Sequence, residues 1–491
     1  MTASAHVAGE THDRRSIDLP AAQRTLATAI LRMGKPVVIV LINGGSIALE
    51  GGVTHSFLLR FTARAGASAG NHSGNVRIAL DNTTDIDVTV RAQVWPFTLP
   101  PLQASFGTVF NFPFRSDADG ATDLAEYYPR TSQGGVLDPA VQAAYFDTLC
   151  DARVPADDPY LVAPRPIEDY VALAACGAKM FNLLDVSRVA GNGTMLTNYT
   201  SAQIDTTLEL LEPTVAKLTS MGLIDRAYVY GFDERPGSYA GAIAQLFGAV
   251  KARFPRVRTM AVLRWAPEPS LPIDIWVNLY SLFDEGAAAA FRASGAGREA
   301  WAYHCISPRP SPPTGPMPWL NTFVELPISD ARLLGWWSFG RADGWLYYLV
   351  NGWGGVDDGP QRPRAHRTLA LLPGSSTRTN FSAVRYNAAA VPGDKTAFSN
   401  GDGILIYPGC QGPLSSLRLE AFRDGLEDLE LLRALERSGG SGAAGAHAAA
   451  QRVITGFVPA GGAGADAGVN VSLVKLEASR VEAATALVRY M

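Results

Sequence analysis

Two neighbouring carboxylates end the most strand-like run of the chain. The segment Ala227-Tyr-Val-Tyr-Gly-Phe-Asp-Glu-Arg-Pro236 is apolar and aromatic up to Phe232 and then presents Asp233 and Glu234. Because unpaired carboxylates are costly to bury, we expect this pair where a strand opens to solvent or to a ligand. Neighbouring acids raise one another's pKa, which helps one of them stay protonated near neutrality, so the pair suits proton transfer.

A helix start is the alternative for the same residues. Asp233 would then be the N-cap and Glu234 would lie in the first turn. In a regular strand adjacent side chains point to opposite faces, so both carboxylates can serve one ligand only if the backbone bends between Phe232 and Glu234. Gly231 and Pro236 make such a bend plausible.

Strand-like and helix-like runs alternate between Gln103 and about Gly412. This alternation predicts a (β/α)₈ TIM-like barrel, with an open doubly wound sheet as the alternative. No G-x-G-x-x-G turn or P-loop is present. The predicted strands are 105–111, 179–184, 226–232, 258–263, 275–280, 299–304, 344–349 and 403–407, and the predicted helices are 139–150, 167–176, 204–221, 239–254 and 322–337.

Four regions follow from this pattern. Residues 1–52 carry one helix–strand unit of an α/β sheet, and residues 53–101 carry short alternating strands of a small, truncated β-sandwich. Residues 102–412 are predicted to form the barrel. Residues 413–491 are predicted to be C-terminal helices packed on it, with a linker-like stretch over 438–449.

Composition narrows the classes of function. The chain has 491 residues, a formal net charge of −4 and no basic cluster, which argues against nucleic-acid binding. No apolar run is long enough to span a bilayer, and no signal peptide is visible. No metal-ligand spacing occurs, so we predict neither a metal nor another cofactor. The sequence leaves the oligomeric state open.

Cysteines and glycosylation triplets bear on the compartment. The four cysteines are scattered, and we predict free buried thiols. Six N-x-S/T triplets lean towards the secretory pathway, but such triplets also arise by chance, so the compartment stays open. These triplets begin at Asn71, Asn82, Asn192, Asn198, Asn380 and Asn470.

Aromatic residues gather in the second half of the predicted barrel. Each one taken alone is better explained by core packing, but several at predicted strand ends favour a cleft that binds the apolar face of a sugar. The aromatic residues are Trp265, Trp276, Tyr280, Trp301, Tyr303, Trp336, Trp337, Trp345, Tyr347, Tyr348 and Trp353.

The order and spacing of several motifs resemble glycoside hydrolase family 123 over about residues 98–435. The family's members have a β-sandwich followed by a (β/α)₈ barrel, and the short sandwich here departs from that pattern. The motifs are Tyr230-Gly-Phe-Asp-Glu234, Trp301-Ala-Tyr-His-Cys-Ile306, Asp330-Ala-Arg-Leu-Leu-Gly-Trp336, Asp343-Gly-Trp-Leu-Tyr-Tyr348, Gly401-Asp-Gly-Ile-Leu-Ile-Tyr-Pro-Gly409 and Leu414-Ser-Ser-Leu-Arg-Leu-Glu-Ala-Phe-Arg-Asp-Gly-Leu-Glu-Asp428.

The resemblance implies a retaining exo-β-N-acetylgalactosaminidase that uses the substrate's own 2-acetamido group as nucleophile, a recognised exception to carboxylate nucleophiles. Asp233 would orient that group while an oxazolinium intermediate forms. Glu234 would protonate the leaving oxygen and then activate water. The expected partner is a glycan or glycoconjugate substrate.

Five further residues are predicted sugar contacts because they lie at or near predicted strand ends: Tyr303, Trp337, Tyr347, Asn351 and Trp353. The Arg and Asp residues of the last motif, by contrast, are predicted to be an ion-paired support for the barrel.

Two other hypotheses remain beside this one. Under the first, the chain is a catalytically decayed carbohydrate-binding protein on the same scaffold. Under the second, it is a glycosidase for a different sugar. Residues 10–45 also resemble part of the C-terminal domain of glycoside hydrolase family 3, and we interpret this stretch as a fused remnant or a gene-model artefact without activity of its own.

Overall fold

The structure is a computed structural model in which the chain divides into two compact units, Met1–Thr98 and Leu99–Met491. It describes residues 63, 66–78, 86–99, 106–112, 139–308, 319–324, 326–351, 401–408, 413–454 and 473–490. The predicted helix–strand fragment over 1–52 lies outside the described residues, as does the predicted sugar contact Trp353.

The first unit contains one antiparallel strand pair. Strands β1 (Gly70–Ile78) and β2 (Ile86–Val94) pair in register from Gly70 opposite Val94 to Ile78 opposite Ile86. Both overlap strands expected from the alternating pattern. The described residues of this unit form a two-stranded sheet, so they do not confirm the predicted sandwich.

The second unit is built on eight parallel strands that follow one another round a ring in chain order. Strand β10 pairs back onto β3, and a backbone ladder is missing only between β4 and β5, so the barrel is nearly closed. The strands are β3 (Gly107–Asn111), β4 (Ala156–Asp157), β5 (Phe181–Asp185), β6 (Ala227–Gly231), β7 (Arg258–Val262), β8 (Ile275–Leu279), β9 (Glu299–His304) and β10 (Gly344–Tyr347).

Side chains bridge the gap between β4 and β5. The Asp157 carboxylate accepts the backbone N–H of Asn182 at 2.9 Å, and the Asn182 amide donates to the carbonyl oxygen of Asp158 at 2.8 Å. At the end of β5, the backbone N–H of Asp185 donates to the carbonyl oxygen of Leu161 at 2.6 Å. Hydrogen bonding therefore continues round the ring although β4 has only two residues.

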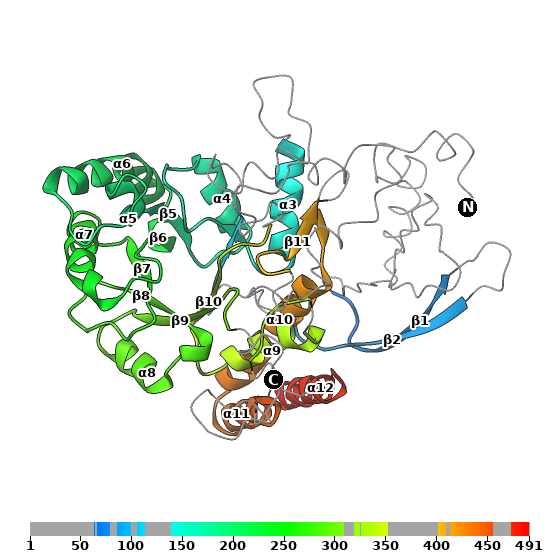
Figure 1. The fold of residues 1–491 in the computed structure, drawn as a ribbon. Coiled ribbons are helices and arrows are strands. Elements are labelled where there is room, and N and C mark those ends of the chain that lie inside the picture. Colours follow the sequence, from blue (N-terminus) through cyan, green and yellow to red (C-terminus); the bar gives the residue numbers. More distant parts are fainter. Residues whose placement is uncertain are drawn as a thin grey trace, which may run out of the picture. The chain divides into compact units, whose positions relative to one another are not determined.

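Helices lie outside the ring of strands (Figure 1). Helix α6 begins with a capping box, in which Thr200 and Gln203 satisfy each other's backbone N–H groups. The helices are α3 (Pro139–Asp151), α4 (Ile167–Ala175), α5 (Val186–Ala190), α6 (Ser201–Ser220), α7 (Ala240–Arg253), α8 (Glu285–Ala293), α9 (Ile328–Ser338), α10 (Leu417–Arg437), α11 (Gly440–Ile454) and α12 (Leu473–Tyr490), with short 3₁₀ turns at Ile224–Arg226, Gly237–Tyr239 and Tyr280–Leu282.

Two apolar clusters follow from the alternation of side chains along the strands. The larger cluster lies between strands and helices, and includes Val229 of β6 and Leu246 of α7. The smaller cluster fills the barrel interior. Its buried members are Val109, Met180, Tyr228, Tyr230, Met260, Val262, Ile275, Val277, Leu279, Trp301, Tyr303 and Leu346.

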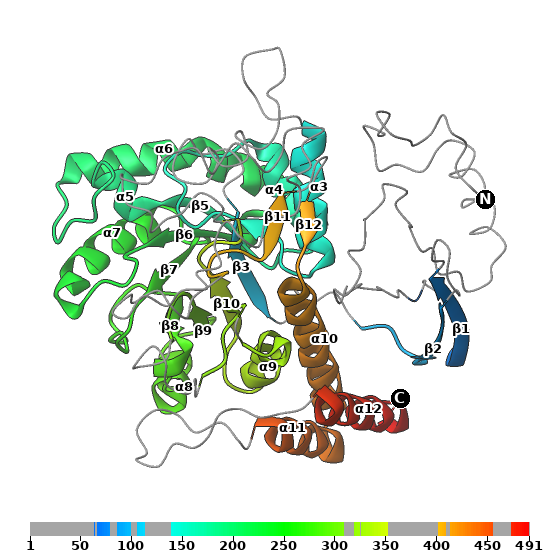
Figure 2. The ribbon, with the colours of Figure 1, turned by 45° about the vertical axis from the view of Figure 1, so that its right-hand side comes forward.

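The C-terminal helices pack against one another and against α9. Helix α10 lies along α9, and α11 and α12 lie beside its far end (Figure 2). The predicted linker over 438–449 is wrong, because α11 occupies it. Its glycines and alanines let this helix approach α10 closely, and Ala446 is fully buried.

One predicted barrel strand is also wrong. Residues 406–408 form β11, which pairs antiparallel with β12 (Pro413–Ser415) in a separate two-stranded sheet. The eighth place in the barrel belongs to β4, which is too short to show any periodicity in the sequence. The predicted helix at 322 begins only at Ile328, directly after Pro327.

Two of the four cysteines are not free thiols. Cys150, at the end of α3, forms a disulfide with Cys176 at the end of α4, with a Cα–Cα distance of 5.7 Å. The two cysteines are 26 residues apart, and only the packing of these helices brings them together. Cys305 is a free cysteine, and Cys410 lies outside the described residues.

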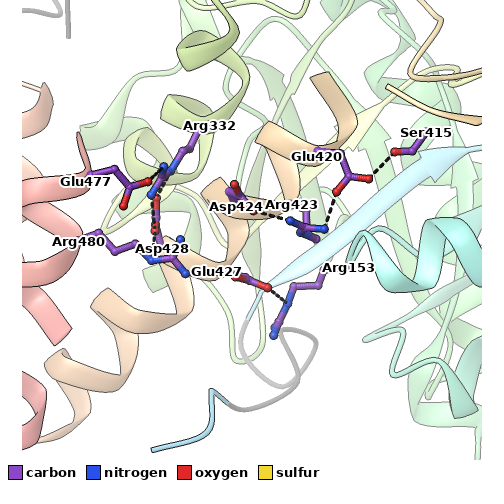
Figure 3. A network of polar contacts seen from close by, with 10 residues as sticks. All are labelled: Arg153, Arg332, Ser415, Glu420, Arg423, Asp424, Glu427, Asp428, Glu477 and Arg480. Carbon is purple, nitrogen blue, oxygen red and sulfur yellow. Dashed lines mark hydrogen bonds and ion pairs between the residues drawn. The ribbon is translucent and has the colours of Figure 1, made fainter. Parts of the chain in front are cut away.

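Ion pairs join the C-terminal helices to the barrel layer (Figure 3). Asp428 of α10 is fully buried and accepts from Arg332 of α9 at 2.7 Å, and it also pairs with Arg480 of α12 at 3.3 Å. Arg423 pairs with Asp424 and with Glu420 on its own helix. These contacts agree with the predicted role of the motif as a support.

Candidate active site at the carboxyl ends of the strands

The backbone leaves the strand geometry directly after β6. Phe232 has a φ of 58° and Glu234 a φ of 50°, and both lie in the left-handed region that residues with a side chain seldom adopt. The Glu234 N–H donates to the carbonyl oxygen of Val262 on β7 at 2.9 Å. The bend expected between Phe232 and Glu234 is therefore present, and it is not the start of an α-helix.

The Phe232 ring anchors this bend. It is fully buried and meets the rings of Tyr199, Tyr239 and Phe247 at steep angles, with centroid separations of 6.3, 6.5 and 5.3 Å. With this ring directed into the helix layer, the two acidic side chains that follow are left at the rim of the barrel.

Asp233 lies on the side of the rim next to β4 and β5. The Tyr160 and Tyr230 rings stand at 89° to one another, with centroids 5.6 Å apart. Burial raises the pKa of both phenols, and the charge of Asp233 raises it further. Burial raises the pKa of Asp233, and the neighbouring charge of Glu234 raises it further. The Tyr230 hydroxyl and Arg188 oppose this shift by favouring the charged form of the carboxylate.

Glu234 lies on the side of the rim next to β7 and β9. Its carboxylate accepts from the Arg264 guanidinium at 2.6 Å and from the Tyr303 hydroxyl. Arg264 also donates to the Tyr303 oxygen at 3.3 Å, so the three side chains form a closed set of contacts. Burial raises the pKa of Tyr303, and the hydrogen bond to Glu234 raises it further.

Both carboxylates therefore lie at the carboxyl ends of the barrel strands. Tyr230 and Tyr303 belong to the cluster that fills the barrel interior, and each of these tyrosines lies against one of the acids. Asp233 is half-buried and Glu234 is more exposed. This arrangement offers two neighbouring acids in different surroundings, Asp233 half-buried near two phenols and Glu234 more exposed beside Arg264 and Tyr303.

The other predicted sugar contacts are placed differently. The Tyr303 hydroxyl donates to Glu234. The Trp337 ring on α9 lies between strands and helices, with its centroid 5.4 Å from that of Tyr280 and 5.7 Å from that of Trp345. Tyr347 is fully buried and stacks on His304 at 4.4 Å. This placement favours packing roles for Trp337 and Tyr347, and their sugar-binding roles stay predictions.

Asn351 is fully buried and forms a β-bridge with Ile404. Neither polar atom of its side chain has a hydrogen-bond partner among the described residues. Its role as a sugar contact also stays a prediction.

Several residues of this rim were not predicted. Arg264 follows β7, Tyr160 follows β4, and Arg188 lies in the first turns after β5. Burial raises the pKa of Asp185, the last residue of β5, to about 7. The sequence signal that could have identified Arg264 and Arg188 is their position just after an apolar, strand-like run. Tyr160 had no such signal, because the two-residue strand β4 is not recognisable in the sequence.

Tyr348 and Asp402 form a further part of the rim. The Tyr348 hydroxyl donates to the Asp402 carboxylate at 2.8 Å. Arg418 of α10 holds the turn that carries Asp402, since it donates to the backbone carbonyl oxygens of Gly401 and Ile404 at 2.7 and 2.5 Å.

Metal clusters and membrane-spanning helices are absent from the described residues. Within the part of the chain that the structure describes, no group of three or more His, Cys, Asp or Glu side chains could hold a metal ion. In that same part, no helix is both long enough and apolar enough to cross a bilayer.

A TIM-like barrel with an acidic pair at the carboxyl ends of its strands is a frequent scaffold for enzymes. Residues 205–435 match the profile of the family described as glycoside hydrolase 123, catalytic domain. The predicted resemblance is thus confirmed over this segment. The match includes Asp233 and Glu234.

Among solved structures, the fold is similar to that of a family 123 glycoside hydrolase from Clostridium perfringens, studied for glycolipid glycan hydrolysis. The TM-score is 0.53 at 12% identity, and the match covers 87% of this chain and 76% of that one. A family 5 xyloglucanase from Bacteroides ovatus matches with a TM-score of 0.28 at 11% identity, over 73% of this chain and 86% of that one. No match was found among curated proteins.

Proposed function

We propose that this protein is a retaining glycoside hydrolase that removes terminal β-linked 2-acetamido-2-deoxyhexoses, with N-acetylgalactosamine favoured. The observation that carries the proposal is the left-handed bend at Phe232 and Glu234, which brings two sequence neighbours to one barrel rim inside the matching segment. A regular strand would have sent one of the two carboxylates away from it.

Adjacent carboxylates suit substrate-assisted chemistry. A retaining enzyme with its own nucleophile places two carboxyls about 5–5.5 Å apart, on opposite sides of the scissile bond. Neighbours in sequence are poorly suited to flank a bond in this way. We infer that the acetamido oxygen of the substrate attacks the anomeric carbon and forms an oxazolinium intermediate.

The two acids then have separate roles. Asp233 accepts the acetamido N–H and stabilises the positive charge of the intermediate. Glu234 donates its proton to the glycosidic oxygen, which leaves as an alcohol, and then takes a proton from the water that opens the ring. Tyr303 and Arg264 hold the Glu234 carboxylate in the orientation that these transfers need.

A panel of aryl β-glycosides with and without the 2-acetamido group tests the reaction class. Hydrolysis of the acetamido substrates alone is expected, because only these substrates carry the internal nucleophile. Equal turnover of aryl β-galactoside would rule out substrate assistance and support a glycosidase for a different sugar. Binding of the sugar without any turnover would instead support a decayed, carbohydrate-binding protein.

Two substitutions test the assigned roles. Glu234→Gln should lower kcat by about 10²- to 10⁴-fold, and Asp233→Asn should lose activity without rescue by azide. Formation of an inverted glycosyl azide by Asp233→Asn would indicate a carboxylate nucleophile. Glu285→Gln is a matched control, since Glu285 is also an exposed acid paired with an arginine, Arg341, at 2.7 Å. This control should keep normal kcat.

A further inference from the structure

The bend at Phe232 places its backbone N–H where no strand carbonyl receives it. The paired positions of β5 and β6 end with Asp185 opposite Tyr230, and their register shifts between Asn182 and Asp185. Instead, the Phe232 N–H donates to the Ser187 hydroxyl oxygen at 3.1 Å. Ser187 is fully buried in helix α5, directly after β5.

The Ser187 hydroxyl is itself oriented by a carboxylate. Its single proton is donated to Oδ1 of Asp185 at 2.7 Å, which leaves a lone pair for the Phe232 N–H. Asp185 is fully buried and also accepts the Arg188 backbone N–H at 3.0 Å as N-cap of α5. Because these groups are buried, the hydrogen bonds between them are shielded from water.

A second contact connects Asp185 with the surroundings of Asp233. The Arg188 guanidinium lies 3.3 Å from Oδ2 of Asp185 and 5.0 Å from the centre of the Tyr160 ring. Tyr160 in turn meets Tyr230 edge to face, and the charge of Asp233 acts on both phenols. Asp185 therefore acts on the backbone of the bend through Ser187 and on the environment of Asp233 through Arg188.

We propose that Asp185 and Ser187 are positioning residues that hold the Phe232–Glu234 bend and so keep Asp233 and Glu234 in their working geometry. This inference rests on the proposed function for its kinetic consequence, but its structural content is independent of that function. Neither residue has to touch the substrate. They act through the Phe232 amide and the Arg188 guanidinium.

Ser187→Ala and Ser187→Cys test the hydroxyl directly. Alanine removes the acceptor for the Phe232 N–H, and cysteine nearly restores the volume but is a weak acceptor. Ser338→Ala is the matched control, because Ser338 is also buried and its hydroxyl donates to a backbone carbonyl within α9 at 2.8 Å. All variants are compared as the full chain.

Two readouts are measured on each variant. A crystal structure reports the φ angles of Phe232 and Glu234, and steady-state kinetics on an aryl β-N-acetylgalactosaminide report kcat and KM. Both Ser187 variants should lose the left-handed φ at Phe232 and show a kcat lower by about 10- to 100-fold, since small misplacements of reacting groups have effects of this size. KM should change by less than about threefold, as is expected when mainly transition-state interactions are lost.

An unchanged φ at Phe232 in both Ser187 variants would overturn the inference. An equal fall of kcat in Ser338→Ala would also overturn it, because general destabilisation would then explain the loss. If the wild-type protein hydrolyses no aryl glycoside, the proposed function fails. The φ angles of the Ser187 variants would still decide whether the hydroxyl holds the bend.

Discussion

Individual side chains at the rim have different roles although the sequence presents them alike. Tyr303 and Tyr347 both occur near the ends of aromatic strands, yet Tyr303 reaches Glu234 while Tyr347 stacks on His304. The difference comes from which face of its strand each residue occupies. Sequence position suggested both as sugar contacts, and the contact with Glu234 singles out one of them.

The Tyr303 hydroxyl allows a test of the role of a single side chain. Tyr303→Phe keeps the buried ring but removes the hydrogen bond to Glu234, so we expect kcat to fall about tenfold, the equivalent of one hydrogen bond of ordinary strength. Tyr280→Phe is a suitable control, because this buried tyrosine also loses one hydrogen bond, to the carbonyl oxygen of Leu320. Similar kcat values for the two variants would contradict a role for the Tyr303 hydroxyl in catalysis.

Asp330 on α9 should make the stability depend on pH. It is buried, one of its carboxylate oxygens has no hydrogen-bond partner among the described residues, and burial raises its pKa from 3.8 to about 7. Since the folded state binds this proton more tightly than the unfolded state, the contribution of Asp330 to stability falls as pH rises from about 4 to about 7.

Asp330→Asn should remove that dependence. The free energy of unfolding of the variant minus that of the wild type should grow from pH 4 to pH 7, by at most about 4 kcal/mol, and stay constant above pH 8. Urea titrations at fixed pH values measure this difference. A difference that does not change with pH would show that the Asp330 carboxyl is solvated.

At the scale of elements, the crossing of α9 and α10 is unusually close. A Cβ atom at Gly335 would lie 2.0 Å from the carbonyl oxygen of Gly425, and one at Gly425 would lie 2.3 Å from that of Arg332. Each glycine therefore allows the backbone of the other helix to approach. The same approach lets Arg332 and Trp336 of α9 reach Asp428 of α10, each at 2.7 Å.

Alanine at either glycine should force these helices apart. Gly335→Ala and Gly425→Ala are each expected to lower the free energy of unfolding by about 1–3 kcal/mol, as overpacking does in well-packed cores. Gly248→Ala in α7 has open space at its Cβ and should be neutral or stabilising by up to about 1 kcal/mol. Denaturant unfolding compares the three, and equal effects would contradict the close crossing.

For the barrel as a whole, the Asp157 carboxylate is a central contact across the gap between β4 and β5. Asp157 accepts from Arg165 at 2.5 Å, from the Tyr228 hydroxyl at 2.9 Å and from the Asn182 N–H at 2.9 Å. Arg165 is also buried, so it would keep an uncompensated charge if Asp157 were lost.

Asp157→Ala should therefore destabilise the second unit by about 3–5 kcal/mol, the usual effect of breaking a buried ion pair by removing one partner. Asp225→Ala is the control, because it removes an Asp–Arg ion pair, with Arg256, in which both side chains are exposed. It should lower the free energy of unfolding by at most about 1 kcal/mol. Denaturation midpoints give both values. If both variants lost the same amount, the bridge would not support closure.

The barrel was predictable from the sequence to the extent that its strands are long and apolar. Seven of the eight strands follow from such runs, but β4 has two residues and no visible period. The run at 403–407 had the right composition, yet β11 pairs with β12 outside the barrel. Strand composition indicates a strand and does not indicate its partner, because pairing depends on contacts between distant segments.

The sequence by itself determined the alternation of strands and helices, the position of Asp233 and Glu234 after a buried strand, and the need for a bend there. These features depend on local composition and period. The tertiary structure decided how the bend is held, with the Phe232 amide on Ser187 and the Glu234 amide on Val262, and which side chains face each acid. It also decided the Cys150–Cys176 pairing and the closure of the barrel by Asp157, because these depend on contacts between distant segments that no local pattern records.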